Sequence, residues 1–427
     1  MIQELKIKNF LSFKDEVVFS FEATSDTTHE NYYITEIVPG VRLLKLCMVY
    51  GANASGKSNL IESFQFLKNI VEKLRTDKNE GTSFIPFLLS NEKKKNGGFE
   101  LTFYADKTKY VYALELDSDK IISEKLNYYP GTQPATLFSR VYNEISDSSE
   151  ISYGSKVKIN KAVKDEIIAK TLKNVSFFVG YSQVNYTQTE IEKAFNWFSD
   201  QLLDSIDPNI GLTGYTNSAV KKDEKIKNFA INFLRNAQYN ITNIEIETES
   251  EEIPEGFIKA LEESSMPESE KKKLINEGIQ NHHAEFEHTV KIGNVEEKHY
   301  LPEYLQSAGT MRYYGLSAPL YKAFTNNAFL GIDEIDSSLH SHLTKHFVRE
   351  YLMKCSDHSN TQLLMTTHNM ALLNEKDLLR KDAIWFTEKH ENGSTDLYSM
   401  TDFDIRKELS YFKAYNTGKF GAIPNVD

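Results

Sequence analysis

Eight consecutive residues, Gly51 to Ser58, have the types and spacing that can hold a phosphate group. They read Gly-Ala-Asn-Ala-Ser-Gly-Lys-Ser, follow an apolar run ending at Val49, and precede a helical pattern of apolar residues starting at Leu60. The glycines let successive backbone N–H groups surround a phosphate, and the positive end of the following helix adds to the attraction. This order of strand, turn and helix predicts a phosphate-binding P-loop and a nucleoside triphosphate ligand.

Individual roles in this loop follow from the same chemistry. We expect Lys57 to reach the β- and γ-phosphates and the Ser58 hydroxyl to bind Mg²⁺. The loop therefore predicts a nucleoside triphosphate together with Mg²⁺. The residues that we assign to nucleotide binding are Asn53, Gly56, Lys57, Ser58 and Asn59.

A second acidic motif completes the predicted site. The segment from Phe329 to Glu334 is an apolar run that ends in two carboxylates, which is the Walker B arrangement. Asp333 is expected to hold Mg²⁺ through its water shell, and Glu334 to orient and polarise the attacking water as the catalytic base. Two adjacent acidic residues are common by chance, so the assignment of this motif depends on the P-loop upstream.

Three more features lie downstream of the P-loop. Ser307 and Gly309 open an amphipathic pattern and so could bind an anion through hydroxyl, N–H and helix dipole, although Ser307 is equally well explained as a helix cap. Asp336 follows the acidic pair, and His368 ends an apolar strand, where it is either a γ-phosphate contact or merely a polar strand end. Their order and spacing argue against chance.

Together these motifs resemble the ABC-type ATPase heads of the SMC, RecF and double-strand-break repair group. The chain is more closely similar to the bacterial abortive-infection ATPases of the AbiLi-like, RloB-associated kind. The segments that carry the resemblance are Asn9–Lys14, Gly51–Leu60, Ser307–Thr310, Asp333–Glu334, Thr367–Asn369 and Gly418–Pro424.

The resemblance implies an α/β fold: an ABC/SMC-like P-loop NTPase head with an antiparallel β subdomain and a mostly helical insertion. It also implies a head-to-tail dimer in which Ser307, Gly309 and Thr310 form a signature that acts on the partner's nucleotide. Asp336 would then lie in the D-loop at the dimer seam, and His368 would be the catalytic γ-phosphate switch. Leu11 stands where many relatives carry arginine, and Gln183 is only a weak candidate for the Q-loop glutamine.

The function that the resemblance implies is an ATP-hydrolysing sensor of a bacterial anti-phage system. An ATP-driven homodimer or higher homo-oligomer would control a separate effector, an RloB-like, Toprim-related nuclease or a toxin. One alternative is a RecF-like DNA-repair ATPase that binds DNA directly, and another is an ATP-bound scaffold with little turnover. A transporter subunit fits least well.

The elements that must position these residues fall into three expected parts. They are an N-terminal ATPase lobe over 1–189, a helical insertion over 190–281 and a C-terminal ATPase lobe over 282–427. Alternating apolar residues predict strands, and helical spacing predicts helices. The predicted strands are Glu4–Phe10, Val17–Phe21, Phe99–Phe103, Tyr110–Leu116, Ile121–Tyr129 and Val175–Val179; a helix is predicted over Asn160–Leu172, and an acidic connector over Glu245–Glu255.

Composition narrows the class further. No stretch is long and apolar enough for a membrane span, and two distant cysteines exclude a disulfide framework, so we expect a cytoplasmic protein. The formal charge of −12 argues against coating nucleic acid by bulk charge. Three other groups are interpreted as non-functional: Asp402 and Asp404 as a solvated turn, the histidines 282, 283 and 288 as split between two strand faces, and Lys271–Lys273 as a solvated helix face.

Overall fold

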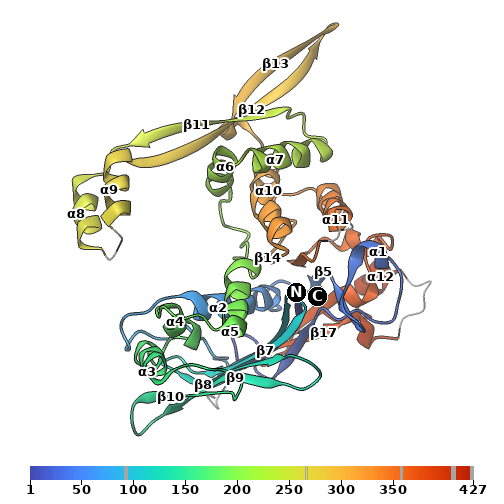
Figure 1. The fold of residues 1–427 in the computed structure, drawn as a ribbon. Coiled ribbons are helices and arrows are strands. Elements are labelled where there is room, and N and C mark those ends of the chain that lie inside the picture. The colour runs from blue at the N-terminus through green and yellow to red at the C-terminus, as the bar shows by residue number, and fades with distance from the viewer. Residues whose placement is uncertain (91–94, 265, 267, 356–358, 405–409, 424–427) are drawn as a thin grey trace. The chain divides into compact units, whose positions relative to one another are not determined.

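The computed structural model describes residues 1–427 except 91–94, 265, 267, 356–358, 405–409 and 424–427. The chain forms two compact units, coloured by chain position in Figure 1. The first unit comprises Met1–Pro208, Ala323–Ser337 and Thr344–Asp427, and the second comprises Asn209–Lys322 and Ser338–Leu343. The helical segment that starts the expected insertion, near residue 190, therefore belongs to the first unit.

A five-stranded sheet forms the centre of the first unit. Its strands β14, β15, β5 and β16 are parallel, and the edge strand β17 is antiparallel to β16. The first three are buried along their whole length, as expected for near-continuous apolar runs in a covered parallel sheet. The bounds in spatial order are β14 (Phe329–Ile332), β15 (Gln362–Thr366), β5 (Leu46–Tyr50), β16 (Ile384–Lys389) and β17 (Thr395–Ser399).

A seven-stranded antiparallel sheet forms the other layer of this unit. The five strands predicted before residue 130 are confirmed in the middle and at one end of this sheet, including the pairing of the first two strands of the chain. The bounds in spatial order are β10 (Ser148–Tyr153), β9 (Ala135–Asn143), β8 (Ile121–Tyr129), β7 (Thr108–Leu116), β6 (Gly97–Ala105), β1 (Ile2–Lys8) and β2 (Val17–Ser20).

Helix α2 (Lys57–Glu72) lies between the two sheets. Phe64 packs on Phe329 of the parallel sheet with ring centroids 4.5 Å apart, and Phe66 stacks on Phe99 of the antiparallel sheet at 5.2 Å. Aromatic residues on opposite faces of one helix therefore join both layers into one core. The remaining described helices and strands of the unit are α1 (Glu30–Tyr33), β3 (Ile34–Val38), β4 (Val41–Leu44), α3 (Lys161–Lys170), α4 (Phe177–Ser182), α5 (Thr189–Asn196), the π-helix η1 (Trp197–Gln201), α11 (Ser341–Cys355, from Thr344), the 3-10 helices η3 (Met370–Asn374), η4 (Lys381–Ala383) and η5 (Met400–Asp402), and α12 (Tyr411–Asn416).

Of the two elements predicted near residue 170, one is a helix as predicted and the other differs from its prediction. The predicted helix over Asn160–Leu172 is confirmed as α3, with the Asn160 side chain accepting from the Val163 N–H as an N-cap. The predicted strand over Val175–Val179 is wrong, because α4 begins there and Ser176 caps it through the Phe178 N–H. A short run of apolar residues can form either a buried strand or a buried helix, and its periodicity does not decide between them.

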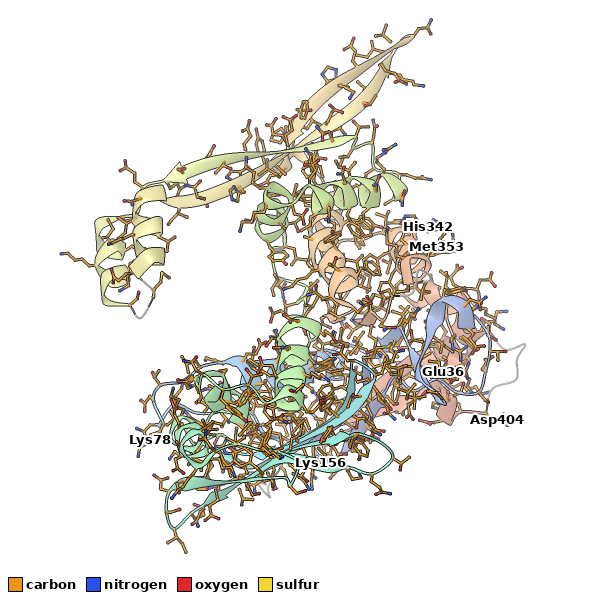
Figure 2. All side chains as sticks on the ribbon, viewed as in Figure 1. Glu36, Lys78, Lys156, His342, Met353 and Asp404 are labelled. Atoms are coloured by element: carbon orange, nitrogen blue, oxygen red, sulfur yellow. The ribbon has the colours of Figure 1, made fainter. Side chains whose placement is uncertain are left out.

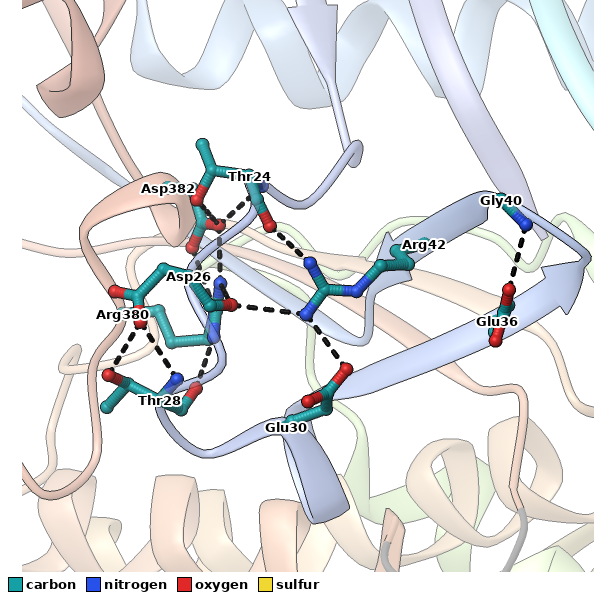
Figure 3. A network of polar contacts seen from close by, with 9 residues as sticks. All are labelled: Thr24, Asp26, Thr28, Glu30, Glu36, Gly40, Arg42, Arg380 and Asp382. Atoms are coloured by element: carbon teal, nitrogen blue, oxygen red, sulfur yellow. Dashed lines mark hydrogen bonds and ion pairs between the residues drawn. The ribbon is translucent and has the colours of Figure 1, made fainter.

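Within the first unit, polar contacts connect the loop around Thr24–Thr28 to the segment before β16 (Figure 3). Asp382 Oδ2 accepts hydrogen bonds from the N–H and hydroxyl of Thr24, both at 2.8 Å, and forms an ion pair of 2.7 Å with Arg380. Arg380 donates to the Asp26 and Thr28 carbonyls, and Arg42 pairs with Glu30 at 2.9 Å. The polar loop over residues 25–31 is thus held by charge-assisted bonds.

The second unit is built on a three-stranded antiparallel sheet in the order β11, β12, β13. The segment predicted as an acidic connector is mostly strand β11, so that prediction is wrong. Its isoleucines alternate with glutamates, and Ile244 and Phe286 are buried on one face of the sheet. The bounds are α6 (Thr213–Lys222), α7 (Glu224–Asn236), β11 (Asn243–Glu251), α8 (Glu255–Glu263), α9 (Glu268–Glu277), β12 (Ile279–Ile292), β13 (Val295–Pro302) and α10 (Ala308–Asn326, to Lys322).

Within the described ranges of the chain, none of the helices has the length and apolarity needed to cross a lipid bilayer.

Candidate functional site

Three of the predicted motifs meet at one edge of the parallel sheet. The P-loop follows β5, the acidic pair Asp333–Glu334 follows β14, and Thr367–His368 follows β15. These strands are neighbours and run parallel, so their carboxyl ends lie at the same edge. This is the place where open α/β sheets bind ligands.

The P-loop has the backbone that its glycines permit. Gly56 has φ of 103°, and a Cβ there would lie 2.5 Å from the Thr395 hydroxyl oxygen. A Cβ on Gly51 would come within 2.5 Å of the Ser55 and Thr387 hydroxyl oxygens. Both positions therefore exclude side chains, which leaves backbone N–H groups available to a phosphate, and the loop fits the triphosphate that its sequence predicts.

Lys57 begins helix α2 and is 5% exposed. Its ammonium donates to the carbonyls of Gly51 at 3.1 Å and Ala52 at 2.9 Å, so it lies across the loop. Burial lowers the pKa of Lys57, and the negative charges of Asp333, Glu334 and Asp336 act in the opposite direction. The lysine ammonium therefore lies close enough to the acidic strand ends for their charges to act on it.

The remaining P-loop candidates differ in exposure. Asn53 and Ser58 are exposed, which leaves the Ser58 hydroxyl accessible to a metal ion. Asn59 is half-buried, and its side-chain amide donates to the Ser12 hydroxyl at 2.6 Å. A direct contact of Asn59 with nucleotide stays a prediction.

The acidic pair is held by Thr366 of the neighbouring strand. Asp333 is 6% exposed and accepts a hydrogen bond from the Thr366 hydroxyl. The Thr366 hydroxyl oxygen also accepts a hydrogen bond from the Glu334 N–H at 2.7 Å. Glu334 has φ of 45°, in the left-handed region. The Asp333 carboxylate and the Glu334 backbone are therefore held in place, and the Glu334 side chain is half-exposed.

His368 and Asp336 complete the edge. His368 Nε2 lies 3.8 Å from Glu334 Oε1, and the imidazole is 35% exposed on its side chain. Asp336 accepts from the Thr367 hydroxyl at 2.7 Å and from the His368 N–H at 3.2 Å. The loop after the acids and the loop after β15 are thus bonded together beside the P-loop.

Comparison with known families gives one match over most of the chain. Residues 46–374 match the model described as "AAA domain, putative AbiEii toxin, Type IV TA system". The chain belongs to this AAA family. The match spans the P-loop, the acidic pair and His368, and a P-loop AAA domain implies nucleotide binding. No curated protein matches the sequence.

Solved structures similar to this AAA protein include SMC heads. The SMC head domain from Thermotoga maritima is 16% identical, with 95% of this chain and 99% of that chain covered and a TM-score of 0.41. An Smc head domain with an extended coiled coil, bound to the C-terminal domain of ScpA and derived from Pyrococcus furiosus, is 13% identical over 98% of both chains with a TM-score of 0.40. At these values the likeness says nothing of activity.

The predicted signature residues of this AAA protein lie in the second unit, at the start of α10. Ser307 is exposed, and its hydroxyl accepts from the Thr310 N–H at 3.1 Å, which is an N-cap contact. A Cβ on Gly309 would lie 2.9 Å from the Ser338 carbonyl oxygen, so the position favours glycine. The structure agrees with Ser307 as a helix cap and leaves its anion-binding role a prediction, because a capping hydroxyl can also face a ligand.

The residues interpreted as non-functional give no metal site among the residues that the structure covers. His282, His283 and His288 contact Thr248, Glu303 and Gln306 respectively. Asp402 closes a capping box with Ser399, and Asp404 is exposed on the first unit (Figure 2). Gln183 ends helix α4 rather than a strand, and its amide donates to the Val179 carbonyl at 3.1 Å. Pro424, the end of the C-terminal motif, lies outside the described residues.

Motif reasoning missed the hydroxyl groups around the site. Thr366, Thr387 and Thr395 bond to the acidic pair or the P-loop, and Ser12 joins two of these segments. Threonine is common in strands for its branched shape alone, so neither its type nor its spacing marks it. The one available signal was the position of Thr366 directly before the predicted Thr367–His368 strand end.

Proposed function

We propose that this AAA protein binds ATP with Mg²⁺ and hydrolyses it to ADP and phosphate. The observation that carries the proposal is the meeting of Lys57, the Asp333–Glu334 pair and His368 at the carboxyl ends of three adjacent parallel strands. Phosphoryl transfer depends mainly on positioning and on charge stabilisation, which this arrangement can supply.

Each residue has a role that its surroundings support. Lys57 supplies positive charge to the phosphates. Its hydrogen bonds to two loop carbonyls hold the ammonium at the loop, where phosphate oxygens would replace the carbonyls as acceptors. Asp333 and the Ser58 hydroxyl are the groups that would hold Mg²⁺, which supplies charge neutralisation. Glu334 positions and polarises the attacking water, and His368, close to its carboxylate, is placed to sense the terminal phosphate.

Two substitutions test the assignment. Lys57→Ala removes the buried charge and should abolish ATP binding. Glu334→Gln keeps shape and hydrogen bonding but removes the base, so it should bind ATP normally while turnover falls at least about 100-fold. Calorimetry with MgATP and a phosphate-release assay measure the two effects. Hydrolysis by Glu334→Gln at the wild-type rate would show that another group is the base.

We further propose that the ATPase works as a dimer that regulates a separate toxin or nuclease in an abortive-infection response. The support is the family to which the chain belongs and the signature-like sequence at the start of α10. Ser307, Gly309 and Thr310 would act on the nucleotide of the second copy, and Asp336 would lie at the seam. An RloB-like, Toprim-related protein is the effector that the sequence resemblance favours.

Recovery of the partner tests this part. The Glu334→Gln protein, tagged and purified from its native host with MgATP, should retain a stoichiometric protein that survives nuclease treatment. Lys57→Ala, which cannot bind ATP, is the matched control and should lose it. Recovery of DNA without a dedicated protein would instead favour a repair ATPase that binds DNA directly.

A further inference from the structure

The hairpin formed by β16 and β17 bonds to the P-loop. Thr395 is 3% exposed; its N–H donates to the Ser12 carbonyl and its hydroxyl to the Ser55 carbonyl, both at 2.8 Å. Thr387 is fully buried, and its hydroxyl oxygen lies 2.6 Å from that of Ser55. Two threonines of one hairpin therefore hold the backbone and the side chain of the same P-loop serine.

The direction of these hydrogen bonds follows from their acceptors. A carbonyl oxygen can only accept, so the Thr395 proton points to Ser55. The Thr395 hydroxyl oxygen also lies 2.8 Å from the Ser12 hydroxyl oxygen, which accepts from the Asn59 amide at 2.6 Å. The result is a chain of polar contacts that joins Asn59, Ser12 and Thr395 to the Ser55 carbonyl.

This chain ends on the peptide that matters for phosphate binding. The Ser55–Gly56 peptide is planar and trans, so its C=O and N–H point in opposite directions. Because the carbonyl is turned toward Thr395, the Gly56 N–H points away from the Thr395 hydroxyl. Gly56 has φ of 103° and lacks a Cβ that would restrict its backbone, so contacts with neighbouring residues must fix this orientation.

We propose that Thr395, assisted by Thr387, is a positioning residue that orients the Gly56 N–H toward the phosphates of the bound nucleotide. The inference rests on the proposed function, since it takes the P-loop to be the nucleotide site. It extends the site to a hairpin more than 300 residues downstream of the P-loop, which no motif marks.

Thr395→Val tests the proposal, since it keeps the branched shape and removes the hydroxyl. The buried Ser55 carbonyl loses its partner, and affinity should fall about tenfold. The loss should be equal for ATP and ADP, because the P-loop backbone surrounds phosphates that both contain. Thr395→Ser keeps the hydroxyl and should restore affinity to within about twofold of wild type.

Calorimetric titration with MgATP and MgADP measures these affinities in the full-length protein. Thr401→Val is the matched control: its hydroxyl contacts Ser399 rather than the P-loop, so affinity should not change. If Thr395→Val does not fold, Thr387→Val carries the same test through the Ser55 hydroxyl.

The outcomes separate the inference from the function on which it rests. Wild-type affinity in Thr395→Val, or an equal loss in Thr395→Ser, overturns the positioning role while the nucleotide site stands. A wild-type protein that binds neither nucleotide overturns the proposed function itself. A selective loss of ATP but not ADP affinity would also overturn the inference, because it would place the effect at the terminal phosphate.

Discussion

Single residues behind the charged groups decide how the site is arranged. Thr366 is fully buried, and its one hydroxyl oxygen serves both acids. It donates to Asp333 and accepts from the Glu334 N–H at 2.7 Å. Glu334 has φ of 45°, which costs free energy in a residue other than glycine, and the bond from its N–H offsets part of that cost. The threonine thus stabilises the backbone turn that presents the predicted base.

Thr366→Val should therefore lower turnover more than it lowers ATP affinity. Loss of a group that orients a catalytic side chain costs roughly 10–100-fold in activity. Steady-state ATPase kinetics and calorimetry separate kcat from binding. Thr361→Val is a matched control, since Thr361 is also fully buried before β15 but its hydroxyl donates to the Ala323 carbonyl. A fall in kcat of the same size in both variants would contradict the positioning role.

Among the elements, the strands next to α4 contain a fully buried ion pair. Arg140 on β9 and Glu124 on β8 lie 3.2 Å apart with no exposed side-chain surface. Glu124 also accepts from the Tyr112 and Ser176 hydroxyls and the Phe177 N–H. Burial lowers the pKa of Arg140, and the charge of Glu124 acts against this shift. The pair ties the sheet to the turn at which α4 begins.

Arg140→Met should therefore be strongly destabilising, because it leaves the Glu124 charge buried without its counter-ion. The expected loss is about 3–5 kcal/mol in the free energy of unfolding. Lys120→Met is the control: Lys120 lies 2.7 Å from Glu144, whose side chain is 73% exposed, so the loss should be about 1 kcal/mol or less. Urea unfolding of both variants measures the difference, and equal losses would refute the account.

Local sequence patterns predict some of these elements and site residues but not others. Alternation predicted β7 and β8 closely, and Asn160 marked the start of α3, because these signals are local. The helix at Phe177 was missed, because a short apolar run does not separate strand from helix and the contact of the Phe177 N–H with Glu124 is a tertiary one. In the site, the charged motif residues could be predicted from spacing, whereas Thr366 and Thr395 act through tertiary contacts that no local pattern records.

For the whole molecule, the division into two units bears on assembly. The P-loop, the acidic pair and His368 belong to the first unit, and Ser307 to Thr310 belong to the second. A signature that acts within one protomer and one that acts on a second copy make different predictions. In a symmetric head-to-tail dimer, each nucleotide would lie between the P-loop of one copy and the signature of the other.

Mixing two inactive variants distinguishes these arrangements. Ser307→Arg should bind ATP normally but not hydrolyse it, and Lys57→Ala should not bind ATP. In a mixed dimer one site carries both defects, while the other combines an intact Lys57 with an intact Ser307. With random pairing, roughly a quarter of the wild-type sites are then restored. ATP turnover measured across mixing ratios should peak near equal amounts, whereas a flat line would place Ser307 and Lys57 in the same protomer's site.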